Sequence, residues 1–197
     1  MTPYEPQSTF GIALRVARAL ESVGAAYFLG GSLASSIQGD PRATNDIDFV
    51  VQLSPSSVPA LARALGPDFE VDEVSLAEAV RRHGSWNVFF LPQFVKVDLF
   101  QCGAGEFDQS EFSRRSKFEI RSGEFLYLKS PEDSVLRKLL WYRQGGEVAS
   151  HQWRDVVEVL RVNAATLETG YLEEWAAKLG LENLLQRAID EARGPKR

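Results

Sequence analysis

The stretch that decides the fold is residues 27–51, which read YFLGGSLASSIQGDPRATNDIDFVV. It begins with a short apolar run, Tyr27-Phe28-Leu29, which predicts a buried strand that ends in the turn Gly30-Gly31-Ser32. A helix is expected over residues 33–37, a loop over residues 39–45 and a second strand over residues 46–53. A strand, a glycine turn, a helix and an acidic strand therefore follow one another.

The acidic strand carries two carboxylates on one face. Side chains of a strand alternate between its faces, so Asp46 and Asp48 share a face while Ile47, Phe49 and Val51 occupy the other. Like charges on an otherwise apolar strand repel each other and resist burial. A divalent cation would remove that conflict, because Mg²⁺ binds one or two carboxylates together with substrate phosphates. The alternative is a solvated strand end, the commoner meaning of an isolated Asp-x-Asp pair.

A third carboxylate lies on a later predicted strand, residues 94–101. Alternation places Lys96 and Asp98 on one face and the aliphatic residues on the other. If this strand neighbours the acidic strand, Asp98 joins Asp46 and Asp48, and three carboxylates can hold two metal ions. The alternative is that Lys96 is a surface partner of Asp98.

The glycine turn suits an anion. Without Cβ atoms, Gly30 and Gly31 let backbone N–H groups approach a phosphate, and a following helix adds partial positive charge. The Ser32 hydroxyl can donate to a phosphate oxygen. Alone, a Gly-Gly-Ser is more often an ordinary tight turn. Together with the acidic strand, it describes a site for a triphosphate and its Mg²⁺.

These residues resemble a known family. The motif Gly30-Gly31-Ser32, then Gly39, Arg42 and Thr44, then Asp46-Ile47-Asp48-Phe49, with Asp98 on a later strand, resembles the DNA polymerase beta-type nucleotidyltransferase superfamily. Within it, the pattern is most similar to the AbiEii-like nucleotidyltransferases, some of which are toxins of toxin–antitoxin pairs.

The resemblance implies a role for each matching residue. Gly30, Gly31 and Ser32 would hold the triphosphate, Asp46 and Asp48 would bind metal, and Asp98 would bind metal and act as general base. The cofactor would be Mg²⁺ or Mn²⁺. Arg42 would lie near the phosphates or merely anchor its loop.

The resemblance also implies a lysine and an aspartate on helices that follow the sheet. Lys138 and Asp155 lie in suitable helical contexts. Both would bind the nucleotide. The alternative is that they are ordinary residues of a helix surface.

The pattern of the rest of the chain predicts an α+β fold, a mixed sheet flanked by helices and then a small C-terminal helical bundle, and the resemblance implies that the sheet is of the nucleotidyltransferase type. Before the boundary near Lys129 we expect helices over residues 9–23, 58–65 and 76–83, a strand over residues 69–74, and hairpins at residues 86–101 and 118–128. After it we expect helices over residues 131–143, 152–162, 171–179 and 184–192. The sequence Ser130-Pro131-Glu132-Asp133 is a capping box that starts the first of these, and Gly145-Gly146 should end it. The predicted domains are therefore residues 1–129 and 130–197.

Composition excludes several classes of protein. The formal net charge is −5, the wrong sign for a non-specific nucleic-acid coat protein. Cys102 is the only cysteine, which excludes an intrachain disulfide framework. Neither a signal peptide nor an apolar run of membrane-spanning length is present. We expect a cytoplasmic protein with no membrane partner.

We expect a Mg²⁺-dependent enzyme that transfers NMP from an NTP to an acceptor hydroxyl and releases pyrophosphate. The acceptor stays open among a tRNA 3′ end, a protein and a small molecule, and a toxin would have a cognate antitoxin as partner. The alternatives are a catalytically silent nucleotide-binding or partner-binding module of the same fold, and a purely structural interaction domain without metal dependence.

Overall fold

The structure is a computed structural model, and it describes residues 8–39 and 44–195. They form two compact units. The sheet unit contains the described residues 8–33 and 44–128, and the helical unit contains residues 34–39 and 129–195. Helix α2 (Gly31–Gln38) begins in the first unit and ends in the second.

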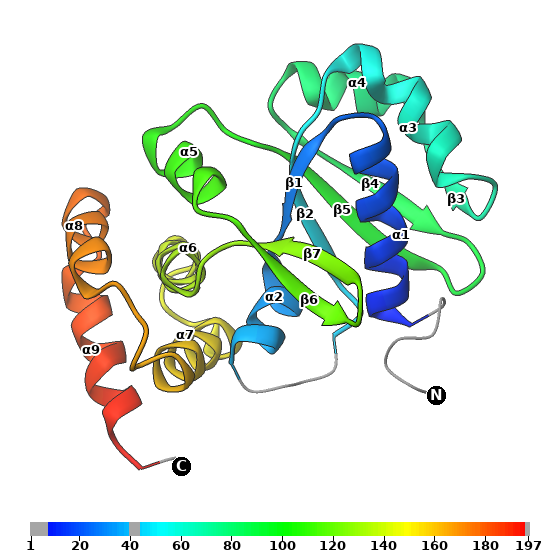
Figure 1. The fold of residues 1–197 in the computed structure, drawn as a ribbon. Helices are drawn as coiled ribbons and strands as arrows, with labels where there is room; N and C mark the ends of the chain where they lie inside the picture. Colours follow the sequence, from blue (N-terminus) through cyan, green and yellow to red (C-terminus); the bar gives the residue numbers. More distant parts are fainter. Residues whose placement is uncertain (1–7, 40–43, 196–197) are drawn as a thin grey trace. The chain divides into compact units, whose positions relative to one another are not determined.

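Within the described residues, the sheet unit holds one mixed sheet of seven strands in the order β3-β4-β5-β2-β1-β7-β6 (Figure 1). The strands are β1 (Ala26–Leu29), β2 (Ile47–Gln52), β3 (Phe69–Glu70), β4 (Ser85–Phe90), β5 (Val95–Gln101), β6 (Ser116–Arg121) and β7 (Glu124–Leu128). Strand β2 pairs parallel to β5, and β1 pairs parallel to β7; the other neighbours are antiparallel. Both predicted hairpins, β4–β5 and β6–β7, are confirmed.

One face of the sheet is covered by helices α1 (Thr9–Ser22), α3 (Val58–Leu65) and α4 (Glu73–Arg81) (Figure 1). Tyr27 of β1 is buried on this face, and its hydroxyl donates to Glu21 of α1 at 3.0 Å. Alternate residues of the central strands, such as Ile47 and Phe49, are fully buried beneath the same helices. This face is the main core of the unit.

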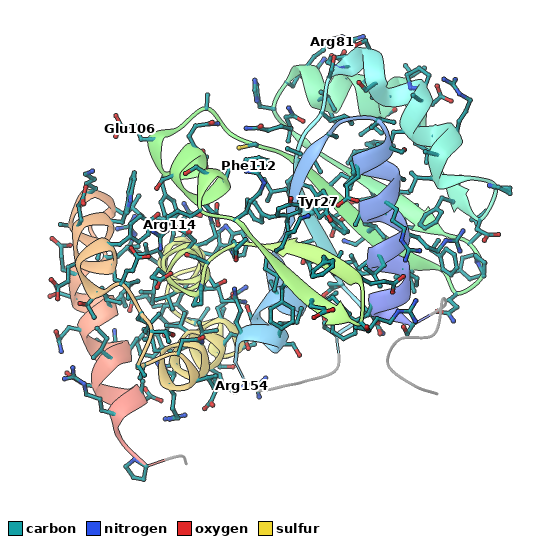
Figure 2. The ribbon with its side chains drawn as sticks, in the orientation of Figure 1. Tyr27, Arg81, Glu106, Phe112, Arg114 and Arg154 are labelled. Atoms are coloured by element: carbon teal, nitrogen blue, oxygen red, sulfur yellow. The ribbon has the colours of Figure 1, made fainter. Side chains whose placement is uncertain are left out.

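The opposite face is only partly covered, by helix α5 (Glu106–Ser113). Phe112 of α5 packs on Phe28 of β1, with ring centroids 5.6 Å apart, and Cys102 completes the buried cluster. Figure 2 labels Phe112 and Tyr27, which come from α5 and β1. The far part of this face carries the exposed residues Ser85, Asn87 and Phe89 of β4.

The helical unit is built from α6 (Pro131–Gln144), α7 (Ser150–Val162), α8 (Thr169–Leu179) and α9 (Glu182–Arg193). The predicted start of α6 is confirmed, because Ser130 accepts a hydrogen bond from the backbone N–H of Asp133 and Pro131 occupies the first turn. Gly145 follows the last helical residue, as expected.

The unit is also tied together by Gln38. Its side-chain amide donates to the Lys129 carbonyl at 2.6 Å and accepts from the Ser134 hydroxyl. This arrangement fastens the end of α2 to the helical unit.

Two predictions about elements were wrong. The strand expected over residues 69–74 ends at Glu70, because Asp72 caps α4 by accepting hydrogen bonds from the backbone N–H groups of Val74 and Ser75. Helix α5 was not predicted.

No described helix has both the length and the apolar character that crossing a bilayer requires.

Candidate active site

The glycine turn packs directly against the acidic strand. Strand β1 ends at Leu29, and Gly30 donates its backbone N–H to the Asp48 carbonyl at 2.8 Å. Gly31 has a φ of 58°, in the left-handed region, and an ideal Cβ there would lie 1.7 Å from Asp48 Oδ2. Glycine is therefore required at position 31 both by the backbone conformation and by the closeness of the Asp48 carboxylate.

Two of the three predicted carboxylates come together by strand register. Asp48 of β2 is the direct partner of Asp98 on the parallel strand β5, so their side chains share a face. Asp46 lies just before β2 and is exposed, whereas Asp98 is 9% exposed. The neighbourhood of the two strands, on which the grouping of the carboxylates depended, is confirmed.

Lys96 gives this acidic face its positive charge. Its Nζ lies 2.8 Å from Asp98 Oδ2, which confirms the ion pair considered from the sequence. The hydrogen bond to Asp98 is the largest influence and raises the pKa of Lys96; burial opposes it, and the charges of Asp98, Asp46 and Asp48 raise the pKa further. The ammonium group therefore stays protonated and offsets part of the carboxylate charge.

The oxygen donors on this face suit a hard divalent cation. Mg²⁺ takes one or two carboxylates and completes its shell with water and substrate phosphates, which Asp48 and Asp98 could satisfy beside the glycine turn. The Lys96 ammonium already shows that a cation is stable against Asp98. Among the residues the structure describes, no three His, Cys, Asp or Glu side chains form a ready metal-binding group. The set of three metal ligands stays a prediction.

Lys138 and Asp155 lie together in the helical unit. The Lys138 Nζ lies 2.9 Å from Asp155 Oδ2 and 3.2 Å from Gln152 Oε1, and the two charged side chains are 1% and 6% exposed. They are therefore a buried ion pair and not ordinary surface residues. Their role in binding a nucleotide stays a prediction, and Arg42 lies outside the described residues.

The sequence analysis did not connect strand β4 with the site. Asn87 is the antiparallel partner of Asp98, and Phe89 is the partner of Lys96, so both share the face of the carboxylates. The alternation of residues 86–91 predicts that the strand has two different faces, but it does not show which of them lies on the same face of the sheet as Asp98.

Comparison with solved structures identifies the architecture. A nucleotidyltransferase-like antigenic protein from Paracoccidioides brasiliensis aligns with a TM-score of 0.55 and 20% sequence identity, over 93% of this chain and 92% of its own. The antibiotic-resistance factor ANT(2'')-Ia aligns with a TM-score of 0.53 and 13% identity, over 91% of this chain and 96% of its own. The chain has a nucleotidyltransferase fold.

The nucleotidyltransferase fold confirms the predicted fold class, a mixed sheet with flanking helices and a helical C-terminal part. No family model matches the sequence. No curated protein matches it either. The similarity to the AbiEii-like group therefore stays a prediction from the motif residues.

Proposed function

We propose that this protein is a nucleotidyltransferase that moves NMP from an NTP to an acceptor hydroxyl and releases pyrophosphate. The observation that carries the proposal is the register of Asp48 and Asp98 beside the Gly30-Gly31 turn. Phosphoryl transfer needs a positioned phosphate and neutralisation of its charge. In a nucleotidyltransferase fold, the close backbone turn can position the phosphates, and the two neighbouring carboxylates can hold the cation that neutralises them.

In this proposal, each group of the chain has a distinct task. Gly31 and Ser32, at the start of α2, hold the phosphates through backbone and hydroxyl donors. Asp48 and Asp98, with Asp46, would hold Mg²⁺ or Mn²⁺, which neutralises phosphate charge when bound. Asp98 accepts the proton of the acceptor hydroxyl. The acceptor oxygen bonds to the α-phosphorus as the bond from that phosphorus to pyrophosphate breaks.

The experiment measures pyrophosphate release and label transfer from each α-labelled NTP with Mg²⁺ or Mn²⁺. The acceptor panel contains tRNA, protein and hydroxylated small molecules, the last because ANT(2'')-Ia is an antibiotic-resistance factor. Asp48→Asn and Asp98→Asn should each abolish transfer. Asp190→Asn removes the same charge from an exposed position of α9 and should keep full activity. Transfer that survives both site variants would refute the proposal.

A toxin role adds a narrower expectation. If the protein acts as an AbiEii-like toxin, its expression should arrest growth, the arrest should need Asp48, and a cognate antitoxin should relieve it. Growth that is unaffected by the wild-type protein would refute the toxin role but not the transferase proposal.

A catalytically silent nucleotide-binding module is the second candidate. The observation that favours it is the Lys96–Asp98 ion pair, which already occupies one of the carboxylates that an active enzyme would use for metal. Calorimetry separates the two candidates. Tight, metal-dependent NTP binding without turnover on any acceptor would favour the silent module.

A further inference from the structure

The β4–β5 hairpin exposes aromatic rings beside the carboxylates. Phe89 and Phe100 are 37% and 39% exposed, and Phe94, at the tip, is 83% exposed. Phe94 also has a φ of 54°, a left-handed conformation that is costly for a residue with a Cβ, and its exposed ring gains little burial in return. Exposed apolar side chains grouped in this way are typical of a surface that binds a partner.

Strand register orders these rings along the carboxylate face. Phe89 is the partner of Lys96, Asn87 of Asp98, and Ser85 of Phe100. Residues two apart on a strand lie about 6.8 Å from each other. One aromatic ring therefore lies on each side of Asp98, one step along the strands.

The outer edge of β4 is open at this level. Within the described residues, β3 pairs with β4 only at Phe89 and Phe90. The Gln101 N–H donates to the Gly84 carbonyl, and bonded pairs alternate in an antiparallel ladder, so Ser85 and Asn87 direct their N–H and C=O groups toward the open edge. Both residues are exposed. Such an edge can accept a further strand.

We propose that this edge and its aromatic face bind the acceptor, and that the acceptor is an extended polypeptide segment. The segment adds as a strand beside Ser85–Val88, about two strand spacings or roughly 9.5 Å from β5. A Tyr side chain is long enough to cross Asn87 and bring its hydroxyl to Asp98, while the next side chain on that face lies against Phe89. This inference rests on the proposed function.

Charge favours a polypeptide over a nucleic acid. Glu70 pairs with Phe89 and so shares the face that carries Asp48 and Asp98, while Lys96 contributes one positive charge. A phosphate backbone needs a positive groove. The backbone of a peptide is neutral and gains its affinity from hydrogen bonds along the strand edge.

The transfer step on this acceptor balances as follows. The side-chain oxygen of the acceptor bonds to the α-phosphorus of the NTP, the bond between that phosphorus and the pyrophosphate oxygen breaks, and Asp98 takes the hydroxyl proton. The products are a nucleotidylated side chain and pyrophosphate, with no oxidation or reduction.

The test uses three synthetic pools with an α-labelled NTP and Mg²⁺. The first holds end-blocked nine-residue peptides with random residues around a central Tyr. The second is identical except that alternate backbone amides are N-methylated, which prevents strand pairing. The third holds random nine-nucleotide RNAs. Hydrogen exchange of the Ser85 and Asn87 amides reports binding independently of chemistry.

We expect the unmethylated peptides to be labelled at least tenfold more than the methylated ones, and to protect both amides from exchange. Phe89→Ser should reduce peptide labelling at least tenfold. Phe125→Ser is the matched control, because Phe125 is 45% exposed on β7, far along the same sheet. It should leave labelling unchanged.

The other outcomes would each contradict one part of the proposal. Equal labelling of both peptide pools would overturn strand pairing, labelling of RNA alone would overturn the polypeptide acceptor, and equal loss in both phenylalanine variants would overturn the aromatic surface. No amide protection and no labelling, with NTP binding intact, would overturn the docking proposal. Amide protection without peptide labelling, in an enzyme that labels another acceptor of the panel, would overturn the peptide as acceptor, whereas no transfer to any acceptor would refute the proposed enzymatic function.

Discussion

Replacing Gly31 with alanine places a methyl group where the Asp48 carboxylate lies. The new Cβ would stand 1.7 Å from Asp48 Oδ2 and 2.5 Å from its Cγ. Carbon atoms in contact prefer about 3.5 Å, so the carboxylate carbon has to move by roughly 1 Å or more. The φ of 58° adds a left-handed penalty of about 1–2 kcal/mol.

The consequence for activity follows from the displacement. A misplacement of about 1 Å at a reacting site can cost about a hundredfold in rate. We therefore expect Gly31→Ala to lower kcat/KM for pyrophosphate release about a hundredfold and to weaken metal-dependent NTP binding. Urea denaturation and calorimetry with each NTP measure stability and binding separately.

Gly24→Ala provides the matched control. Gly24 has a φ of 70°, and an added Cβ there would meet no atom within 4 Å. Both variants should lose about 1–2 kcal/mol of stability from the backbone, whereas only Gly31→Ala should lose activity. If the two variants bind NTP equally well, the closeness of the turn to Asp48 has no functional meaning and the reasoning fails.

Two further predictions concern stability. Lys138→Met should cost about 3–5 kcal/mol, because it leaves the Asp155 charge buried without its partner, and adding Asp155→Leu should recover much of the loss. Lys178→Met, which breaks the exposed pair with Glu174, should cost less than about 1 kcal/mol in the same urea titration, and an equal cost for both lysines would contradict the argument. Burial, with the Glu21 charge and hydrogen bond, raises the pKa of Tyr27 above its ordinary 10.0. The phenol therefore ionises at lower pH in the unfolded chain than in the folded one. Its contribution to stability is complete below about pH 10 and is lost as the pH rises further. Between about pH 9 and 11, Tyr27→Phe should lose less stability than the wild type does.

The periodicity of the sequence predicted much of the sheet but not its long-range pairing. Alternation along residues 46–53 and 94–101 correctly placed Asp48 and Asp98 on polar faces of their strands. Their direct register depends on β2 and β5 lying parallel, with α3, β3, α4 and β4 between them along the chain. Local patterns carry no information about such a pairing. The sequence analysis could therefore group Asp98 with Asp48 only on the assumption that the two strands are neighbours.

The missed elements have local physical reasons. Helix α5 buries Phe107, Glu111 and Phe112, and this small set gives almost no apolar periodicity in an otherwise polar stretch. The error at β3 came from the alternation of residues 69–74, where the Asp72 cap decides the outcome. A capping aspartate followed by Glu73 was a helix-start signal that outweighs a few alternating residues.

Gly31 and Asp98 carry different kinds of information about the site. The left-handed φ and the contact with Asp48 already require glycine at position 31, so its presence follows from the packing of the fold. Nothing comparable requires an acid at position 98: a small apolar residue would fill a site that is 9% exposed and would remove the repulsion from Asp48. The chain keeps a nearly buried carboxylate there and places Lys96 beside it to offset the charge. A nearly buried charge that the packing of the fold does not require is the stronger sign of function. Substitution of Asp98 is therefore the most stringent test of the enzymatic proposal.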